Sequence, residues 1–161
     1  MGHQSWIRAI APSSDGQFFV TGSGDKTAKI WHIHNPNALH TLEGHQSWIR
    51  AIAINGTGSV VATGGNDKAI KIWQLQGGKL LHTLSGHQQW VRALLFNGNT
   101  LISAAQDKTI RLWNFEQEAC LETLTGHDHW VVSLALVPQQ QILISGSRDE
   151  TVRLWSLFSN D

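Results

Sequence analysis

Histidine, hydroxyl and aspartate side chains recur along the chain in a combination that a serine hydrolase could use. His45 is followed by Thr63 and Asp67, and three similar sets occur elsewhere in the sequence. A Ser-His-Asp hydrolase needs these residue types, because the imidazole takes the hydroxyl proton and the carboxylate orients the imidazole. A catalytic constellation, however, needs one site beside one pocket, whereas this set is repeated. The repetition favours a structural role.

A tryptophan completes each set, as Trp73 does six residues after Asp67. We expect the Trp N–H to donate to the hydroxyl, the hydroxyl to the histidine and the histidine to the aspartate. Such a chain satisfies buried polar groups and holds neighbouring strands together. We call these four sets the tetrads: His3, Thr21, Asp25 and Trp31; His45, Thr63, Asp67 and Trp73; His87, Ser103, Asp107 and Trp113; His127, Ser145, Asp149 and Trp155.

The tetrads belong to an internal repeat. Gly-His pairs begin at residues 2, 44, 86 and 126, and the segments 2–11 and 44–53 are both GHQSWIRAIA. We therefore divide a single domain, residues 1–161, into repeats at approximately 1–37, 38–79, 80–119 and 120–161.

Each repeat reads as four short strands separated by turn residues, with no helical period. In the copy that begins at Gly44 these strands are predicted over 48–54, 59–64, 69–74 and 80–84. An all-β chain with four antiparallel strands in each repeat of about 40 residues is typical of the blades of a β-propeller.

The recurring Gly-His, Asp and Trp resemble the WD-repeat (WD40) family over essentially the whole chain. The residue after each tetrad tryptophan departs from the family pattern, because it is His32, Gln74, Asn114 or Ser156 instead of Asp. The resemblance implies a propeller with structural tetrads, and a scaffold that is not an enzyme.

A second tryptophan lies three residues after each tetrad histidine, at the start of the innermost strand. Alternation places Trp48 and Arg50 on one side of this strand and Ile49 on the other. The resemblance implies that these strand starts, and the residues before each turn Asp, contact ligands at the mouth of the channel. The predicted partner-binding residues are Trp6, Arg8, Trp48, Arg50, Asn66, Trp90, Arg92, Gln106, Trp130 and Arg148. Alternatively, each Trp stacks on the next blade and each Arg only covers it.

Four blades make about half of a ring. Outer strands are predicted at 38–42, 80–84 and 120–124, but the residues after Trp155 are too few for a fourth. We expect two chains to close an eight-bladed ring as a homodimer with two-fold symmetry. The alternative is that the chain is a fragment of a longer propeller.

The composition argues against nucleic-acid and membrane binding. Twelve basic residues balance twelve acidic ones, so we expect neither nucleic acid nor a membrane as a partner. The single cysteine, Cys120, is expected to pack as a small hydrophobe, and a chain with one cysteine and no visible signal peptide is expected to be cytoplasmic. The spacing of His32, His34 and His40 would allow a metal site, but we expect neither a metal nor a cofactor.

The sequence therefore favours a non-enzymatic scaffold that presents the Trp and Arg residues to an unidentified protein or peptide. Three alternatives remain: a lectin-like or small-ligand propeller, an enzyme, and a product of repeat duplication with no selected function. The absence of a unique catalytic site disfavours the enzyme.

Overall fold

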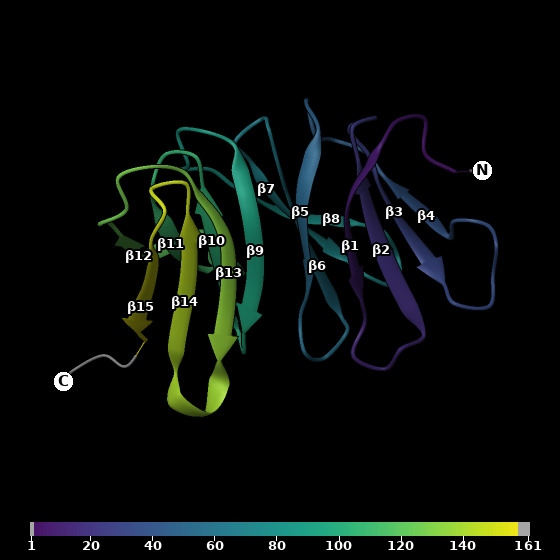
Figure 1. The fold of residues 1–161 in the computed structure, drawn as a ribbon. Coiled ribbons are helices and arrows are strands. Elements are labelled where there is room, and N and C mark those ends of the chain that lie inside the picture. The colour runs from purple at the N-terminus through teal and green to yellow at the C-terminus, as the bar shows by residue number, and fades with distance from the viewer. Residues whose placement is uncertain (1, 158–161) are drawn as a thin grey trace.

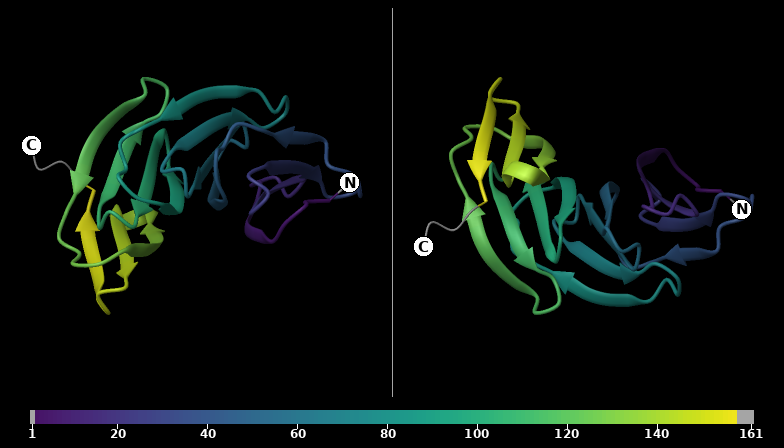
Figure 2. Two further views of the ribbon diagram at one scale, coloured as in Figure 1. Left: turned by 90° about the horizontal axis from the view of Figure 1, so that it is seen from above. Right: turned by 90° about the horizontal axis from the view of Figure 1, so that it is seen from below.

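Residues 2–157 form four antiparallel sheets that stand side by side around an open arc, as the computed structural model describes them (Figures 1 and 2). The predicted all-β class is confirmed. The first blade contains β1 (Ile7–Pro12), β2 (Phe18–Ser23), β3 (Ala28–His32) and β4 (His40–Leu42). The second contains β5 (Ile49–Ile54), β6 (Val60–Gly65), β7 (Ile70–Gln74) and β8 (Leu80–Leu84). The third contains β9 (Val91–Asn97), β10 (Thr100–Ala105), β11 (Ile110–Asn114) and β12 (Ala119–Leu124), and the fourth β13 (Val131–Val137), β14 (Ile142–Ser147) and β15 (Val152–Ser156).

The described part of the fourth blade has three strands, in the order β13-β14-β15. This agrees with the expectation that the last blade lacks an outer strand of its own, while residues 158–161 lie outside the described residues. One element was not predicted, a short 3-10 helix over Pro138–Gln140 between β13 and β14. Within residues 2–157, no helix is long and apolar enough to cross a membrane.

The hydrophobic core lies between the blades. At the first joint, Val20, Ile30 and Leu42 of the first blade cluster with Trp73 and Leu75 of the second. The next joint repeats this arrangement, because Ile70, Ile72 and Leu84 of the second blade cluster with Trp113 and Phe115 of the third. Each blade therefore presents an aliphatic face to the next blade and a tryptophan face to the previous one.

The two ends of the arc leave one face of each kind uncovered. Ile30 is fully buried on the aliphatic face of the first blade, whereas Leu154, its equivalent in the fourth blade, is 68% exposed. Ile49 is fully buried on the tryptophan face of the second blade, whereas Ile7, its equivalent in the first blade, is 52% exposed. The two exposed faces are therefore of the two kinds that pack together at each internal joint.

Candidate functional site

Each tetrad forms the hydrogen-bond chain that its residue types allow. In the second blade, Trp73 Nε1 donates to Thr63 Oγ1 at 2.8 Å, and the same oxygen lies 2.8 Å from His45 Nε2. His45 Nδ1 lies 2.8 Å from Asp67 Oδ2. In all four blades the Trp–hydroxyl distance is 2.8 Å and the His–Asp distance is between 2.7 and 2.9 Å. The structure thus brings all sixteen predicted tetrad residues together in four separate sets.

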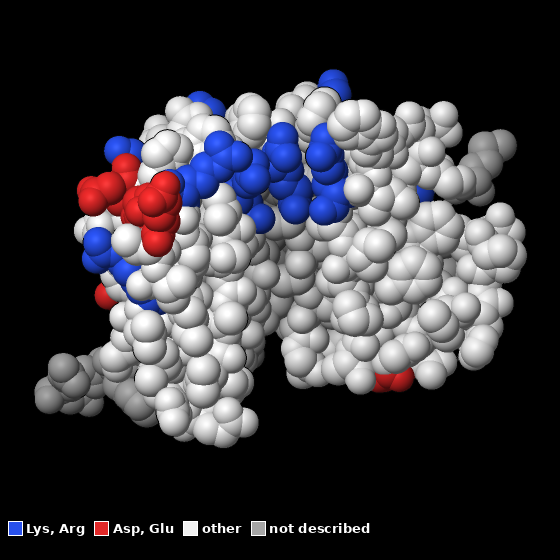
Figure 3. Space-filling view, viewed as in Figure 1, with Lys and Arg blue, Asp and Glu red and all other residues white. Residues whose placement is uncertain are grey.

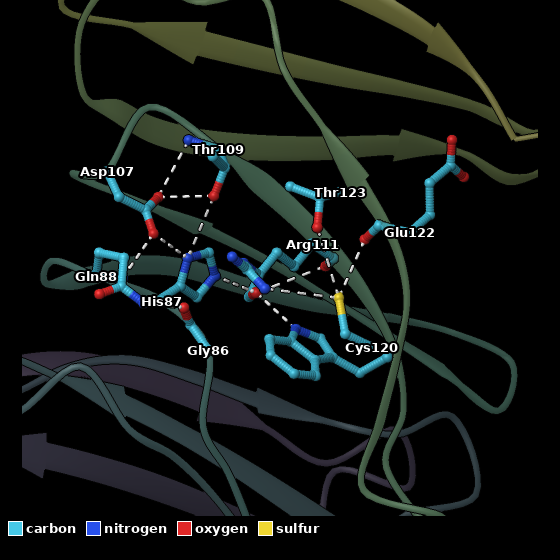
Figure 4. A network of polar contacts seen from close by, with 11 residues as sticks. Gly86, His87, Gln88, Asp107, Thr109, Arg111, Cys120, Glu122 and Thr123 are labelled. Atoms are coloured by element: carbon cyan, nitrogen blue, oxygen red, sulfur yellow. Dashed lines mark hydrogen bonds and ion pairs between the residues drawn. The ribbon is translucent and has the colours of Figure 1, made fainter.

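The aspartate of each tetrad also organises the turn that contains it. Figure 4 shows this for Asp107, whose Oδ2 accepts from the Gln88 amide at 2.9 Å and whose Oδ1 accepts from Thr109 Oγ1 at 2.7 Å. The carboxylate therefore joins the segment before β9 to the turn between β10 and β11. This threonine recurs as Thr27 and Thr151, and it was not predicted although the repeated Asp-x-Thr is visible in the sequence.

These contacts lower the pKa of the turn aspartates. Burial raises the pKa of Asp107, but hydrogen bonds from His87, Thr109 and the Gln88 amide outweigh burial. Its pKa therefore lies well below the usual range of a carboxyl group.

The tetrad hydroxyls are closed to a substrate. Thr63, Ser103 and Ser145 are fully buried, and Thr21 is almost so. Each oxygen already accepts an indole N–H and faces an imidazole, which leaves no approach for an electrophile. The geometry of the tetrads therefore suits cross-linking of strands better than nucleophilic attack.

Tryptophan and arginine side chains alternate along the starts of the inner strands. The Arg8 guanidinium lies 4.8 Å from the Trp6 ring and 5.0 Å from the Trp48 ring. The Arg50 guanidinium lies 5.6 Å from Trp48 and 4.9 Å from Trp90. These distances are typical of cation–π contacts. We call this series, with Arg92, Trp130 and Arg148, the Trp/Arg ladder.

Each arginine of the inner strands lies at a β-bulge, which redirects its side chain. In the pairing of β5 with β6 the register passes from Ile49 to Ala51, so Arg50 has no paired residue opposite it. The same shift leaves Arg8, Arg92 and Val132 without a paired residue in the other blades. A bulge bends the strand and redirects the extra side chain. Simple alternation did not predict this device. Ile49 and Ala51 are both buried, whereas the Arg50 side chain between them is half-buried and lies in the ladder.

The residues before the turn aspartates differ in their contacts. Asn66 Oδ1 accepts a hydrogen bond from Arg50 Nε. Gln106 is buried, and its Nε2 has no hydrogen-bond partner among residues 2–157. Arg148 lies 4.4 Å from the Trp130 ring and supplies the cation in the blade whose inner strand carries Val132.

The residues considered for a metal are dispersed. The His32 and His34 rings are neighbours at 5.7 Å, but His40 Nε2 lies 2.9 Å from the Gln76 carbonyl oxygen of the next blade. No group of three metal-ligating side chains occurs within residues 2–157.

The expectation that Cys120 packs as a small hydrophobe is wrong, because its side chain is exposed. Cys120 belongs to the outer strand β12, and Figure 4 shows its side chain near Arg111. Its Sγ lies 3.8 Å from Arg111 Nη1. An outer strand has only one neighbouring strand in its blade, and solvent reaches residues there that would be covered on an inner strand.

Repeated blades around an arc, each fastened by the same tetrad, define a β-propeller repeat protein. The chain matches the WD40 family, described as WD domain, G-beta repeat, over residues 1–32, 36–74, 78–114 and 118–156. It therefore belongs to the WD40 repeat family, and the resemblance inferred from the sequence is confirmed.

Similar proteins share short segments or the whole fold. The chain is 51% identical over 37 residues to nuclear distribution protein PAC1 of Scheffersomyces stipitis, covering 23% of this chain and 7% of that protein. It is 50% identical over 32 residues to pre-mRNA-splicing factor PRP46 of Yarrowia lipolytica, covering 20% and 7%. The solved structures of U3-55K and of the RRP9 WD40 repeats are 29% and 30% identical, each with a TM-score of 0.91, and the match covers 98% of this chain and 50% of theirs. The chain thus spans under a tenth of these curated relatives and half of the solved chains.

Replacing Asp107 by Ala should lower the free energy of unfolding by about 1–3 kcal/mol, because the His87 ring and the Gln88 amide lose their acceptor. Urea denaturation at pH 7 measures the change. Asp128→Ala is the matched control, since the exposed Asp128 side chain should contribute less than about 0.5 kcal/mol. Equal stabilities of the two variants would contradict a structural role for the tetrad.

The lowered pKa of Asp107 predicts a specific dependence on pH. A carboxylate whose pKa is lower in the folded state stabilises the fold above the unfolded pKa of about 3.9, and this stabilisation is lost as the pH falls. The stability difference between wild type and Asp107→Asn should therefore narrow between pH 7 and pH 3. Urea titrations at both pH values measure it, and a constant or widening difference would refute the assignment.

Proposed function

We propose that this protein is a non-enzymatic scaffold that binds a protein or peptide through the Trp/Arg ladder. The observation that carries the proposal is the alternation of indole and guanidinium groups over neighbouring blades at one rim. Trp and Arg are the residues most enriched at binding hot spots. Trp6 is largely exposed and Trp48 is 39% exposed, so part of the ladder is accessible.

The geometry supports a protein ligand over a sugar. A lectin-like site would offer a free indole face for a sugar ring to stack on. The Trp48 ring instead contacts two guanidinium groups, those of Arg8 at 5.0 Å and Arg50 at 5.6 Å from the ring centroid. A partner would therefore meet a mixed surface of ring edges and guanidinium N–H groups, which suits a polypeptide with acidic and apolar groups.

Burial of the tetrad hydroxyls supports the non-enzymatic assignment. An acyl-transfer enzyme needs a nucleophile that its substrate can reach. The names of the relatives concern nuclear distribution and splicing, but the chain spans too little of them to carry a pathway across. A cytoplasmic location stays a prediction, and it rests on the use of a single cysteine.

We also propose that a second copy of the chain closes the ring. The aliphatic face around Leu154 and the tryptophan face around Ile7 occupy the positions that pack together at each internal joint. Under two-fold symmetry both uncovered faces would be buried, in two equivalent contacts. The solved WD40 chains of twice the matched length support a complete ring of about two such units.

The scaffold proposal predicts that Trp48→Ser abolishes partner capture without unfolding the protein. Cross-linking in native lysate, followed by mass spectrometry, compares the partners that wild type and variant retain. Leu81→Ser is the matched control, because Leu81 is 40% exposed on the outer strand β8 and lies away from the ladder. If Trp48→Ser keeps the full set of partners while Leu81→Ser loses it, the contact surface lies on the outer edge.

Ring closure predicts a particle of twice 17.8 kDa in multi-angle light scattering at micromolar concentration. Leu154→Asp should give a monomer, because a carboxylate would be buried at the new joint. Leu121→Asp changes an exposed leucine on β12 and should leave the dimer intact. A folded wild-type monomer would contradict closure by a second copy and favour a chain with further blades.

A further inference from the structure

Three arginines of the Trp/Arg ladder converge on one small cavity. Arg8, Arg50 and Arg92, which come from the inner strands of three successive blades, line a cavity of about 180 Å³ together with Val132. A single water occupies roughly 30 Å³ of liquid, so the cavity can hold a group several times larger. Its lining is dominated by guanidinium groups.

Among residues 2–157, contact with tryptophan leaves N–H donors of Arg8 and Arg50 available. An arginine presents five N–H donors in its plane, while its flat face is used in stacking. The Arg8 guanidinium lies over the Trp6 and Trp48 rings, at 4.8 and 5.0 Å. Arg50 commits only its Nε to Asn66 and keeps its terminal N–H groups. The rings therefore hold the Arg8 and Arg50 guanidinium groups in place before any ligand arrives.

Among residues 2–157, these arginines have no carboxylate counterion. Every ion pair between described residues involves a histidine, and none involves an arginine. Burial lowers the pKa of Arg50, and the neighbouring charges of Arg92 and Arg8 lower it further. Figure 3 shows a row of Lys and Arg side chains along the upper rim, above the starts of β13, β9 and β5. The cluster thus carries an uncompensated positive charge.

We infer that the cavity between Arg8, Arg50 and Arg92 is a binding site for a dianionic phosphoryl group. The inference rests on the proposed function, since it names the chemistry that the ladder recognises. A phosphoryl group brings nearly two negative charges and three acceptor oxygens, which match three converging guanidinium groups. A carboxylate brings one charge and two oxygens and would leave the cluster undercompensated.

The phosphoryl group can come from a phosphorylated side chain of a protein partner or from a free phosphate compound. Two probes separate these sources, N-acetylphosphoserine amide and pyrophosphate. N-acetylglutamate amide has the same backbone as the first probe but carries a carboxylate, and it tests the choice of phosphoryl over carboxylate. All titrations are made at one ionic strength, because exposed charges are screened by salt.

The experiment follows the Nε–H signals of Arg8, Arg50 and Arg92 by NMR as each probe is added. N-acetylphosphoserine amide should bind about tenfold more tightly than the glutamate compound, and Arg50→Gln or Arg92→Gln should each weaken it about tenfold. Lys79→Gln removes a charge at the exposed turn between β7 and β8 and should have no effect. Circular dichroism verifies that the variants are folded. Two independent arginine variants are made so that the test still holds if one of them does not fold.

Equal binding of the phosphoserine and glutamate compounds would overturn the inference, as would wild-type affinity in both folded arginine variants. Binding of pyrophosphate alone would keep the site and assign it to a free phosphate compound. Loss of partner capture in Trp48→Ser, with no phosphoryl binding to wild type, would remove the phosphoryl site and leave the scaffold standing.

Discussion

One buried hydroxyl in each blade holds the rest of the structure in register. Thr63 shows how: its oxygen accepts the Trp73 indole and meets the His45 ring, and the ring continues to Asp67. Four separated segments of the blade are thereby fixed to each other. Because Trp48 and Arg50 follow His45 closely in the chain, the tetrad also fixes where the inner strand begins. The position of the Trp/Arg ladder thus depends on a hydrogen-bond chain that a ligand cannot reach.

The blades depend on each other in a second way. A blade has two apolar faces and cannot bury both by itself, so each face needs a neighbouring blade. Inside the arc this need is met, and Ile72 and Trp113 are covered at the joint of the second and third blades. At the two ends it is not met among the described residues. The same physical requirement therefore explains the stable interior of the arc and its uncovered ends.

Much of this structure could be predicted from the residues. The spacing of His, hydroxyl, Asp and Trp led to side chains that lie within hydrogen-bond distance, because the repeat fixes both the turns and the strand lengths. The bulge at Arg50 could not be predicted, since alternation assumes a regular ladder of pairs and nothing in the residue types signals an extra residue. The exposure of Cys120 was missed because an apolar equivalent in another repeat does not reveal which side of an outer strand is covered.

Each tetrad is interpreted as a directed chain of hydrogen bonds, in which the hydroxyl donates to the histidine and the histidine donates to the aspartate. If the hydroxyl donates to Nε2, the ring must carry its proton on Nδ1 and donate it to the aspartate. Long-range ¹H–¹⁵N spectra of the imidazoles at pH 7 test this directly, because they report which ring nitrogen is protonated. The account predicts the neutral Nδ1–H form for His3, His45, His87 and His127. Neutral Nε2–H rings, or doubly protonated rings, would contradict it.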